Sequence, residues 1–480
     1  MPLAKLVWRT AAALILLALT STCSLFSPRD EGPWRYRIRV ADADRWLLEV
    51  TAELRSTTPV RLETADNEVS ASLVSVRDGL DRPLSFHDGS WLAQADIIAG
   101  GKIQYEVELG ALLGSRRDID RGLQQGDAIL TSWASWLLRP TGASGDIPVE
   151  IVLDPEVPIA AGATRHGDGL LVRSRDLHRS IYLALGSVAQ RRVSLPSHPS
   201  LGSGNSEVEI ALMPGRLTTP FDGYVSWTQD LLELVCDLWG GFPVERALIV
   251  VLPSGRRRGV SFGKVLPSSV PTVCLWVGSR TREEDFRGEW QFLHELLHLG
   301  FPMTGDVAAW LDEGLATYQE PLLRARAGWM SEAALWEELT DNMPRGLRAL
   351  ERRGIANGRG IDDRYWGGAL FCLLVDLEAR RRTGGRKGIE DGIRQLISED
   401  MRVIHRVRSL EKILQAIDRG IGEPIAQQLW AKYGAQGSDV GWSGLLEKLG
   451  VIRESRSVEL RDDAEWSRWR RALLHRPSQG

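Results

Sequence analysis

The 480-residue chain is poor in cysteine. Four are present, and three of them, Cys236, Cys274 and Cys372, are too widely spaced for a metal-binding pattern. We expect these three to be small buried residues. An exported protein has the alternative of joining two of them in a disulfide.

An excess of positive charge is also lacking. Lys and Arg total 59 against 63 Asp and Glu, which gives a net charge of −4. The basic runs at 255–259 and 378–388 are short, and we interpret them as solvated loop or helix-end charge. The composition therefore excludes the broad basic surface of a nucleic-acid-binding protein, and no nucleic-acid partner is expected.

No hydrophobic run is long enough to span a bilayer comfortably. The run at 11–19 follows Lys5 and Arg9, and a spanning helix needs about 20 apolar residues. This order of charge and apolar residues is typical of a secretory signal, so we expect residues 1–23 to be a signal peptide or an N-terminal membrane anchor. Lipidation at Cys23 and a buried N-terminal helix are alternatives. The expected location is extracytoplasmic, either periplasmic or membrane-anchored.

The hydrophobic pattern changes along the rest of the chain and divides it into three regions. From 34 to about 200, short segments alternate polar and apolar residues between Asp, Gly and Pro clusters, which favours an antiparallel β-sandwich. The Ser-, Gly- and Pro-rich segment 193–207 indicates a domain boundary. Helix and buried-strand patterns mix from 208 to 345, and a helical pattern dominates from 346 to 480. We therefore expect an α+β multidomain protein.

The most informative segment contains His294, Glu295 and His298 in the pattern H-E-x-x-H. Residues four apart on a helix lie on one face, so both imidazoles can reach one metal ion. Neutral imidazole suits Zn²⁺, and a catalytic zinc usually keeps three protein ligands and a water. Glu295 can face that water rather than the metal. The flanking residues are apolar, and burying this trio without a partner would be costly, so the pattern predicts a Zn²⁺ site.

A second helix, expected at 305–321 and ended by Pro321, offers the third ligand. Glu313 is the preferred candidate. Gly314 predicts that this helix and the H-E-x-x-H helix pack closely beside the metal. Thr317 is a candidate for orienting a ligand, with a plain surface position as the alternative. Three other acids are alternative third ligands: Asp312, Glu320 and Asp306.

These two segments, HELLH and WLDEGLATY, resemble the gluzincin metallopeptidases. The similarity is greatest to the glycyl aminopeptidase family and more distant to the aminopeptidase N family. The resemblance implies an antiparallel β-sandwich-like N-terminal domain at 34–200, a thermolysin-like zinc catalytic domain at 208–345, and a helical C-terminal region at 346–480.

The same resemblance assigns roles to individual residues. It places His294, His298 and Glu313 on zinc and makes Glu295 the general base. The segment YWGGALF at 365–371 resembles the Tyr-x-Lys/Gly-Gly-Ala segment of these families, which implies that Tyr365 stabilises the oxyanion.

Three features depart from these families. Only fourteen residues lie between His298 and Glu313, fewer than is usual, so the loop between the two helices is short. The PDZ module common in the glycyl aminopeptidase family has no room after Leu449. The Gly-x-Met-Glu-Asn motif, whose glutamate anchors the free amine of aminopeptidase substrates, is missing.

The missing motif bears on substrate choice. We expect the strand that edges the cleft at 265–279, and this stretch has no acid. The nearest acids downstream, Glu283, Glu284 and Asp285, belong to a charged turn. A buried ammonium without a partner is destabilised by several kcal/mol, so the absence favours an endopeptidase, or loose end specificity, over a strict aminopeptidase. An acid from another segment is the alternative.

The sequence therefore predicts a zinc metallopeptidase that acts on a peptide or protein substrate. Two other functions stay open on sequence grounds. One is a zinc hydrolase of a non-peptide substrate, because the same water-activating site serves other bonds. The other is a non-catalytic binding protein on a peptidase fold, which an intact Glu295 disfavours.

Overall fold

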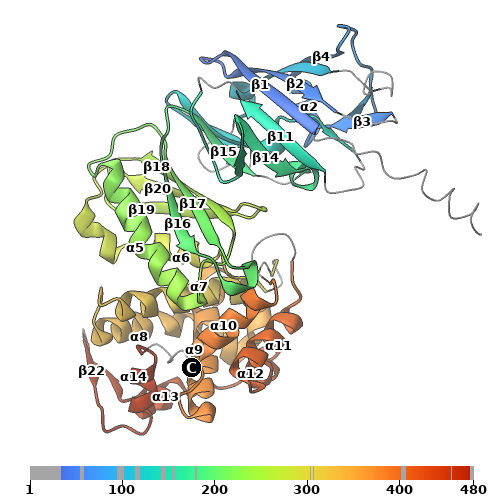
Figure 1. Ribbon diagram of the computed structural model, residues 1–480. Coiled ribbons are helices and arrows are strands. Elements are labelled where there is room, and N and C mark those ends of the chain that lie inside the picture. Colours follow the sequence, from blue (N-terminus) through green and yellow to red (C-terminus); the bar gives the residue numbers. More distant parts are fainter. Residues whose placement is uncertain are drawn as a thin grey trace, which may run out of the picture.

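The computed structural model describes residues 34–475 except 55–58, 94–101, 114–118, 120, 142–146, 154–156, 179–180, 303, 306–307, 402–406 and 456. The predicted signal or anchor segment 1–23, with Cys23, therefore lies outside the described residues. Figure 1 shows three parts in chain order, namely β-sheets at one end, a sheet flanked by helices in the middle, and helices at the other end.

The first part is built from three sheets. The largest has seven strands in the order β13-β14-β11-β1-β2-β7-β4, antiparallel except where β1 pairs with β11. Its strands are β1 (Trp34–Asp42), β2 (Leu47–Glu53), β4 (Leu73–Asp78), β7 (Ile103–Glu108), β11 (Pro148–Leu153), β13 (Thr164–His166) and β14 (Gly169–Arg173). Along β2, buried and half-buried residues alternate, because successive side chains of a strand point to opposite faces.

Two antiparallel four-stranded sheets complete this part, in the orders β10-β3-β6-β5 and β12-β15-β9-β8. The first contains β3 (Val60–Glu63), β5 (Phe86–His87), β6 (Ser90–Ala93) and β10 (Arg139–Pro140). The second contains β8 (Gly122–Gln125), β9 (Ala128–Ser132), β12 (Ile159–Ala161) and β15 (Tyr182–Gly186). Apolar residues between Trp34 and Leu185 form a continuous core inside these sheets.

The middle sheet has five strands in the order β16-β17-β18-β20-β19. They are β16 (Ala189–Pro196), β17 (Asn205–Leu212), β18 (Arg246–Ser254), β19 (Val260–Leu266) and β20 (Thr272–Gly278). β17, β18 and β20 run parallel, and both edge strands are antiparallel to their neighbours. The segment 193–207, where the sequence indicated a boundary, lies in the β16–β17 hairpin of this sheet.

The predicted cleft strand at 265–279 is wrong. That stretch contains β20, whose seven residues are all buried and which lies between β18 and β19 in the sheet. The edge strand beside the H-E-x-x-H helix is β19, which pairs with β20 alone among the described strands and packs against that helix. β19 comes before β20 in the chain, forms a hairpin with it and lies outside it in the sheet. The order of strands in a sheet does not have to follow their order in the chain.

Helices cover one face of the middle sheet and continue into the third part (Figure 1). They are α5 (Phe221–Trp239), α6 (Gln291–Leu297), α7 (Ala309–Arg326), α8 (Glu332–Arg348), α9 (Gly368–Thr383), α10 (Ile389–Ser398), α11 (Leu410–Ile421), α12 (Ile425–Tyr433), α13 (Trp442–Leu449) and α14 (Ser467–Ala472). A small hairpin of β21 (Val451–Arg453) and β22 (Val458–Leu460) joins the last two. One hydrophobic core runs from Val193 to Leu473, so sheet and helices are packed together.

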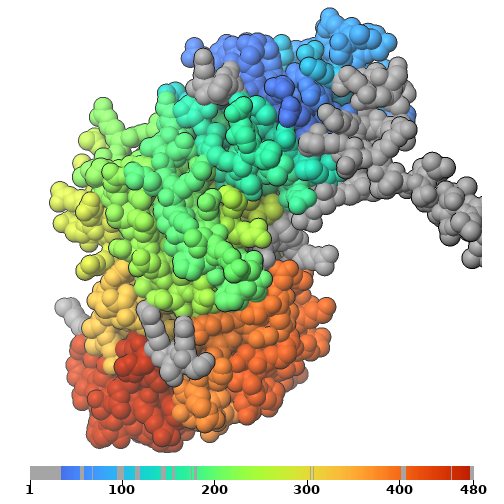
Figure 2. All heavy atoms as spheres, in the orientation of Figure 1, coloured from blue at the N-terminus to red at the C-terminus, as the bar shows by residue number. Residues whose placement is uncertain are grey.

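A smaller core joins the first part to the middle sheet. It includes Leu130 and Tyr182 from one side and Leu248 and Trp276 from the other. Figure 2 shows the surface of the same arrangement, with the blue N-terminal residues at one end and the orange and red C-terminal residues at the other. In the described part of the chain, no helix has the length and apolar character that crossing a membrane requires. Cys274 and Cys372 are buried and Cys236 is half-buried, and all three are free thiols.

Candidate metal centre and active site

Helix α6 holds the first candidate ligand inside the core. Its apolar residues Phe292, Leu293, Leu296 and Leu297 are at most 1% exposed, so hydrophobic burial fixes the helix on several sides. His294 is only 3% exposed. His298 follows directly as the C-terminal cap of α6 in helical conformation, and it therefore stays one turn from His294 on the same face.

Helix α7 brings Glu313 over α6. It begins at Ala309 and runs to Arg326, so the predicted end at Pro321 is wrong. Burial of Leu315, Leu322 and Leu323 in the core outweighs the loss of one backbone hydrogen bond at proline.

The close helix packing predicted at Gly314 involves a different helix. A Cβ at Gly314 would lie 2.4 Å from the backbone of Gly368 on α9. The close approach that this glycine allows is thus between α7 and α9, and not between α7 and α6. It fixes α7, and Glu313 with it, against the helical part of the protein.

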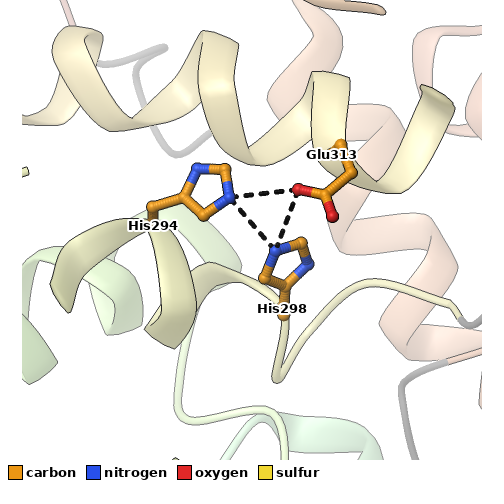
Figure 3. Close-up of side chains that lie close together, drawn as sticks. All are labelled: His294, His298 and Glu313. Atoms are coloured by element: carbon orange, nitrogen blue, oxygen red, sulfur yellow. Dashed lines mark hydrogen bonds and ion pairs between the residues drawn. The ribbon is translucent and has the colours of Figure 1, made fainter. Parts of the chain in front are cut away.

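The structure brings His294, His298 and Glu313 together (Figure 3). The Nε2 atoms of the two histidines are 3.3 Å apart, and Oε2 of Glu313 is 3.2 Å from Nε2 of His294 and 3.6 Å from Nε2 of His298. Ligand atoms bound to a tetrahedral zinc at about 2.0–2.1 Å lie about 3.3 Å from one another. The three side chains therefore match the donor types and spacing of a zinc site.

The other candidate ligands lie differently. Asp312 Oδ1 is 2.9 Å from Nδ1 of His298, on the side of the ring away from the cluster. Glu320 is buried and forms a two-point ion pair with Arg324. Asp306 lies outside the described residues. Of the three acids among them that the structure describes, Glu313 is the one that shares the cluster with both histidines.

Burial and close neighbours shift the pKa values of groups in and beside the cluster. Burial raises the pKa of Glu295, and the nearby His298 and His294 offset this only in part. Burial also opposes ionisation of Glu313, but hydrogen bonds with His294 and His298 outweigh it and bring the pKa of Glu313 well below its usual value. For His298, burial lowers the pKa, yet Asp312 and Glu313 outweigh this and raise it.

Two aromatic rings enclose His294. The Tyr365 ring, from a π-helical turn at Asp363–Gly367, is stacked on the imidazole with centroids 5.5 Å apart and planes at 4°. Burial and the neighbouring Glu313 carboxylate raise the pKa of the Tyr365 hydroxyl, so it stays a hydrogen-bond donor. Trp290, 44% exposed, meets the same imidazole edge-on at 5.7 Å. The predicted tyrosine therefore lies beside the cluster.

Thr317 makes no hydrogen bond to the cluster. Its Oγ1 and the Nδ1 atom of His294 are both buried, and neither has a hydrogen-bond partner among the described residues. The orienting contact that the structure does contain is the one between Asp312 and His298. Sequence reasoning missed this role, although a carboxylate next to a proposed ligand was a signal for it.

The edge strand β19, with sequence VSFGKVL, carries no acidic residue. Two of the three acids of the charged turn, Glu284 and Asp285, pair with arginine. Arg258, in the loop between β18 and β19, hydrogen-bonds Asp285 at 2.8 Å and also pairs with Glu284. These two carboxylates are therefore neutralised at the surface and do not lie free beside the cluster.

In sequence comparisons, no family model matches the chain and neither does any curated protein. In three dimensions it is similar to the crystal structure of an aminopeptidase N family protein from Idiomarina loihiensis, with a TM-score of 0.64 and 14% identity over 87% of this chain and 78% of that chain. An M1 zinc metallopeptidase from Deinococcus radiodurans, solved as a mutant bound to a Tyr-Ser-Ala substrate, matches with a TM-score of 0.49 and 16% identity over 86% and 95% of the two chains.

The first of these likenesses confirms the expected α+β architecture, with a β-rich N-terminal part and a helical C-terminal region, and the expected similarity to the aminopeptidase N family. At this sequence identity it shows the fold alone. The roles of individual residues and the boundaries predicted at 200, 208 and 345 stay predictions.

Proposed function

We propose that this protein is a zinc-dependent metallopeptidase. The observation that carries the proposal is the cluster of two imidazole Nε2 atoms and one carboxylate oxygen within 4.8 Å of one another. His294, His298 and Glu313 hold Zn²⁺, which when bound supplies a positive charge that acidifies a water and polarises the scissile carbonyl.

The protein's own groups carry the proton and the developing charge. Glu295, next to a ligand on α6, takes the proton of the attacking water and later gives it to the departing amine. The buried environment that raises the pKa of Glu295 suits a group that both accepts and returns a proton. The Tyr365 hydroxyl donates a hydrogen bond to the oxyanion that forms as the carbonyl is attacked.

The substrate lies extended along the free edge of β19 and adds a strand to the sheet. Because β19 has no carboxylate and two acids of the charged turn, Glu284 and Asp285, pair with Arg258, a free amine is not required for binding. We therefore favour an endopeptidase, or a peptidase with loose end specificity. The expected location is extracytoplasmic, which rests on the sequence of residues 1–23.

Metal content and hydrolysis together test the proposal. We expect about one zinc per chain in the purified protein by atomic emission, and loss of zinc in His294→Ala and in His298→Ala. Glu295→Gln should keep zinc and lose hydrolysis of a peptide mixture by several orders of magnitude, because the amide cannot accept the proton. Full zinc occupancy in the double histidine variant, or normal turnover in Glu295→Gln, contradicts the proposal.

Glu295→Gln also separates this function from its alternatives. A zinc-loaded wild-type protein that cleaves no peptide, but hydrolyses an ester or epoxide in a Glu295-dependent way, is a hydrolase of another class. A zinc-loaded protein with no Glu295-dependent reaction is a binding protein.

A further inference from the structure

Gly263 lies on β19 where this strand passes the side chain of Glu295. A Cβ at Gly263 would lie 2.5 Å from Cγ of Glu295, 2.8 Å from its Oε1 and 2.9 Å from its Cδ. Non-bonded carbon atoms prefer a separation of about 3.5–4.0 Å. The Glu295 side chain therefore occupies the space that any other side chain at position 263 would need.

Backbone conformation does not account for this glycine. Gly263 is absent from the residues with positive φ, so its conformation is one that other residues adopt. Space is thus the reason for glycine at this position. The steric conflict also involves Cγ, near the root of the Glu295 side chain. Rotating the terminal carboxylate alone does not relieve it, and the whole side chain has to change rotamer.

Neither element can move away easily. Gly263 is paired with Leu275 of β20 in the middle of the β19–β20 ladder. At the start of β19, the Glu289 carboxylate accepts hydrogen bonds from the backbone N–H of Val260 at 2.8 Å and of Gln291 at 2.9 Å. One side chain thus joins the first residue of β19 to the first residue of α6, and α6 is fixed in the core.

We propose that Gly263 is a positioning residue for Glu295. By leaving the side of β19 open, it lets the Glu295 side chain lie against the strand and sets where the carboxylate stands relative to His294, His298 and Glu313. The same strand offers its outer edge to a substrate, so base and substrate are placed by one rigid pair, β19 and α6. This role rests on the proposed function, because it requires Glu295 to be the base.

The first test is kinetic and uses a matched pair of glycine variants in the full-length, zinc-loaded protein. We expect Gly263→Ala to keep its zinc and its KM but to lose roughly 100-fold in kcat, the effect of moving a catalytic group by about 1 Å. Gly288→Ala is the control. Gly288 precedes α6, has no positive φ, and a Cβ there meets nothing within 4 Å. Wild-type kcat in zinc-loaded Gly263→Ala overturns the proposal.

The second test measures the contact itself and does not depend on hydrolysis. Thermal unfolding is compared for Gly263→Ala in the wild-type background and in a Glu295→Ala background, which removes the colliding atoms. We expect Gly263→Ala to lower Tm clearly in the first background and much less in the second. Equal losses in both backgrounds would show that Gly263 has no steric relation to Glu295, and would overturn the proposal.

The two tests also separate this inference from the proposed function. Normal activity in Glu295→Gln contradicts the function, whatever Gly263→Ala does to Tm. A coupled loss of Tm together with reduced kcat in Gly263→Ala supports both.

Discussion

His298 is held between two carboxylates of neighbouring residues on α7. Its Nδ1 atom is 2.9 Å from Oδ1 of Asp312, and its Nε2 atom is 3.6 Å from Oε2 of Glu313. A carboxylate at Nδ1 keeps a proton there and directs the Nε2 lone pair toward the metal position. One turn of α7 therefore supplies a proposed ligand and the group that orients another.

We expect Asp312→Ala to weaken zinc binding by roughly 10- to 100-fold, the usual effect of losing the hydrogen-bond partner of a metal-binding histidine. Asp312→Asn should lose less, because an amide oxygen still accepts the Nδ1–H. The measurement is zinc affinity by competition with a chelator. Asp230→Ala on the exposed face of α5 is the control. Identical affinities in Asp312→Ala and the control would contradict an orienting role.

The stacked position of Tyr365 on His294 allows its ring and its hydroxyl to be tested separately. Tyr365→Phe keeps the ring contact and removes the donor. We expect kcat to fall by about 100- to 1000-fold, as for loss of an oxyanion donor, with zinc content and Tm close to wild type. Tyr365→Ala should additionally lower Tm. An unchanged kcat in Tyr365→Phe would remove Tyr365 from the reaction.

The absence of an acid on β19 predicts tolerance of a blocked amine. Matched peptides with free and acetylated N-termini should both be cleaved, and at internal bonds, because binding relies on backbone hydrogen bonds along the edge strand. Products identified by mass spectrometry check this. If acetylation abolishes cleavage, an acid from another segment anchors the amine and the protein is an aminopeptidase.

Glu209 predicts a pH dependence of stability at the junction of the first part with the middle sheet. It is 5% exposed, accepts the Ala161 N–H at 3.2 Å, and has Arg165 and Arg192 as ion-pair partners. Burial raises its pKa above the usual 4.5, and the two arginines offset this only in part. As pH rises, the Glu209 carboxyl therefore loses its proton in the unfolded chain before it does so in the folded protein. The contribution of Glu209 to the free energy of unfolding is fully present below pH 4.5 and is lost as pH rises through the folded pKa.

We expect the Tm of wild type to fall relative to Glu209→Gln as pH rises above about 4.5, and the two to converge below it. The glutamine keeps an acceptor for Ala161 and cannot ionise. Glu207→Gln, on the same strand but 44% exposed in its side chain, is the control for removing a carboxylate from β17 without removing a buried one. A constant offset between Glu209→Gln and wild type across the pH range would rule out ionisation of Glu209 as the cause.

The spacing of the proposed metal site is local and could be predicted from the sequence. Two histidines four residues apart share a helix face whatever surrounds them, because helix geometry is set by backbone hydrogen bonds. The apolar residues around them in α6 likewise indicated burial. By the same logic the alternating pattern from Trp34 onward indicated strands, and those strands are present.

Choices between neighbouring residues were decided by tertiary structure. Asp312 and Glu313 are adjacent acids on one helix, and the sequence prefers Glu313 as a ligand but leaves Asp312 open as an alternative. Packing of Gly314 against Gly368 helps fix how α7 is rotated, and this rotation directs Glu313 to the cluster and Asp312 to the far side of His298. A rotation of about 100° per residue separates the two, so only the contacts of the whole helix select between them.

Strand order and close contacts across the sheet also depended on the fold. The sequence by itself predicted a strand within 265–279, and β20 lies there, but the sequence placed the edge of the cleft at this strand. The outer position belongs to β19, because pairing partners in a sheet are set by how the chain returns on itself and not by hydrophobicity alone. The requirement for glycine at 263 follows from that position, since it arises only where the edge strand meets the side chain of Glu295.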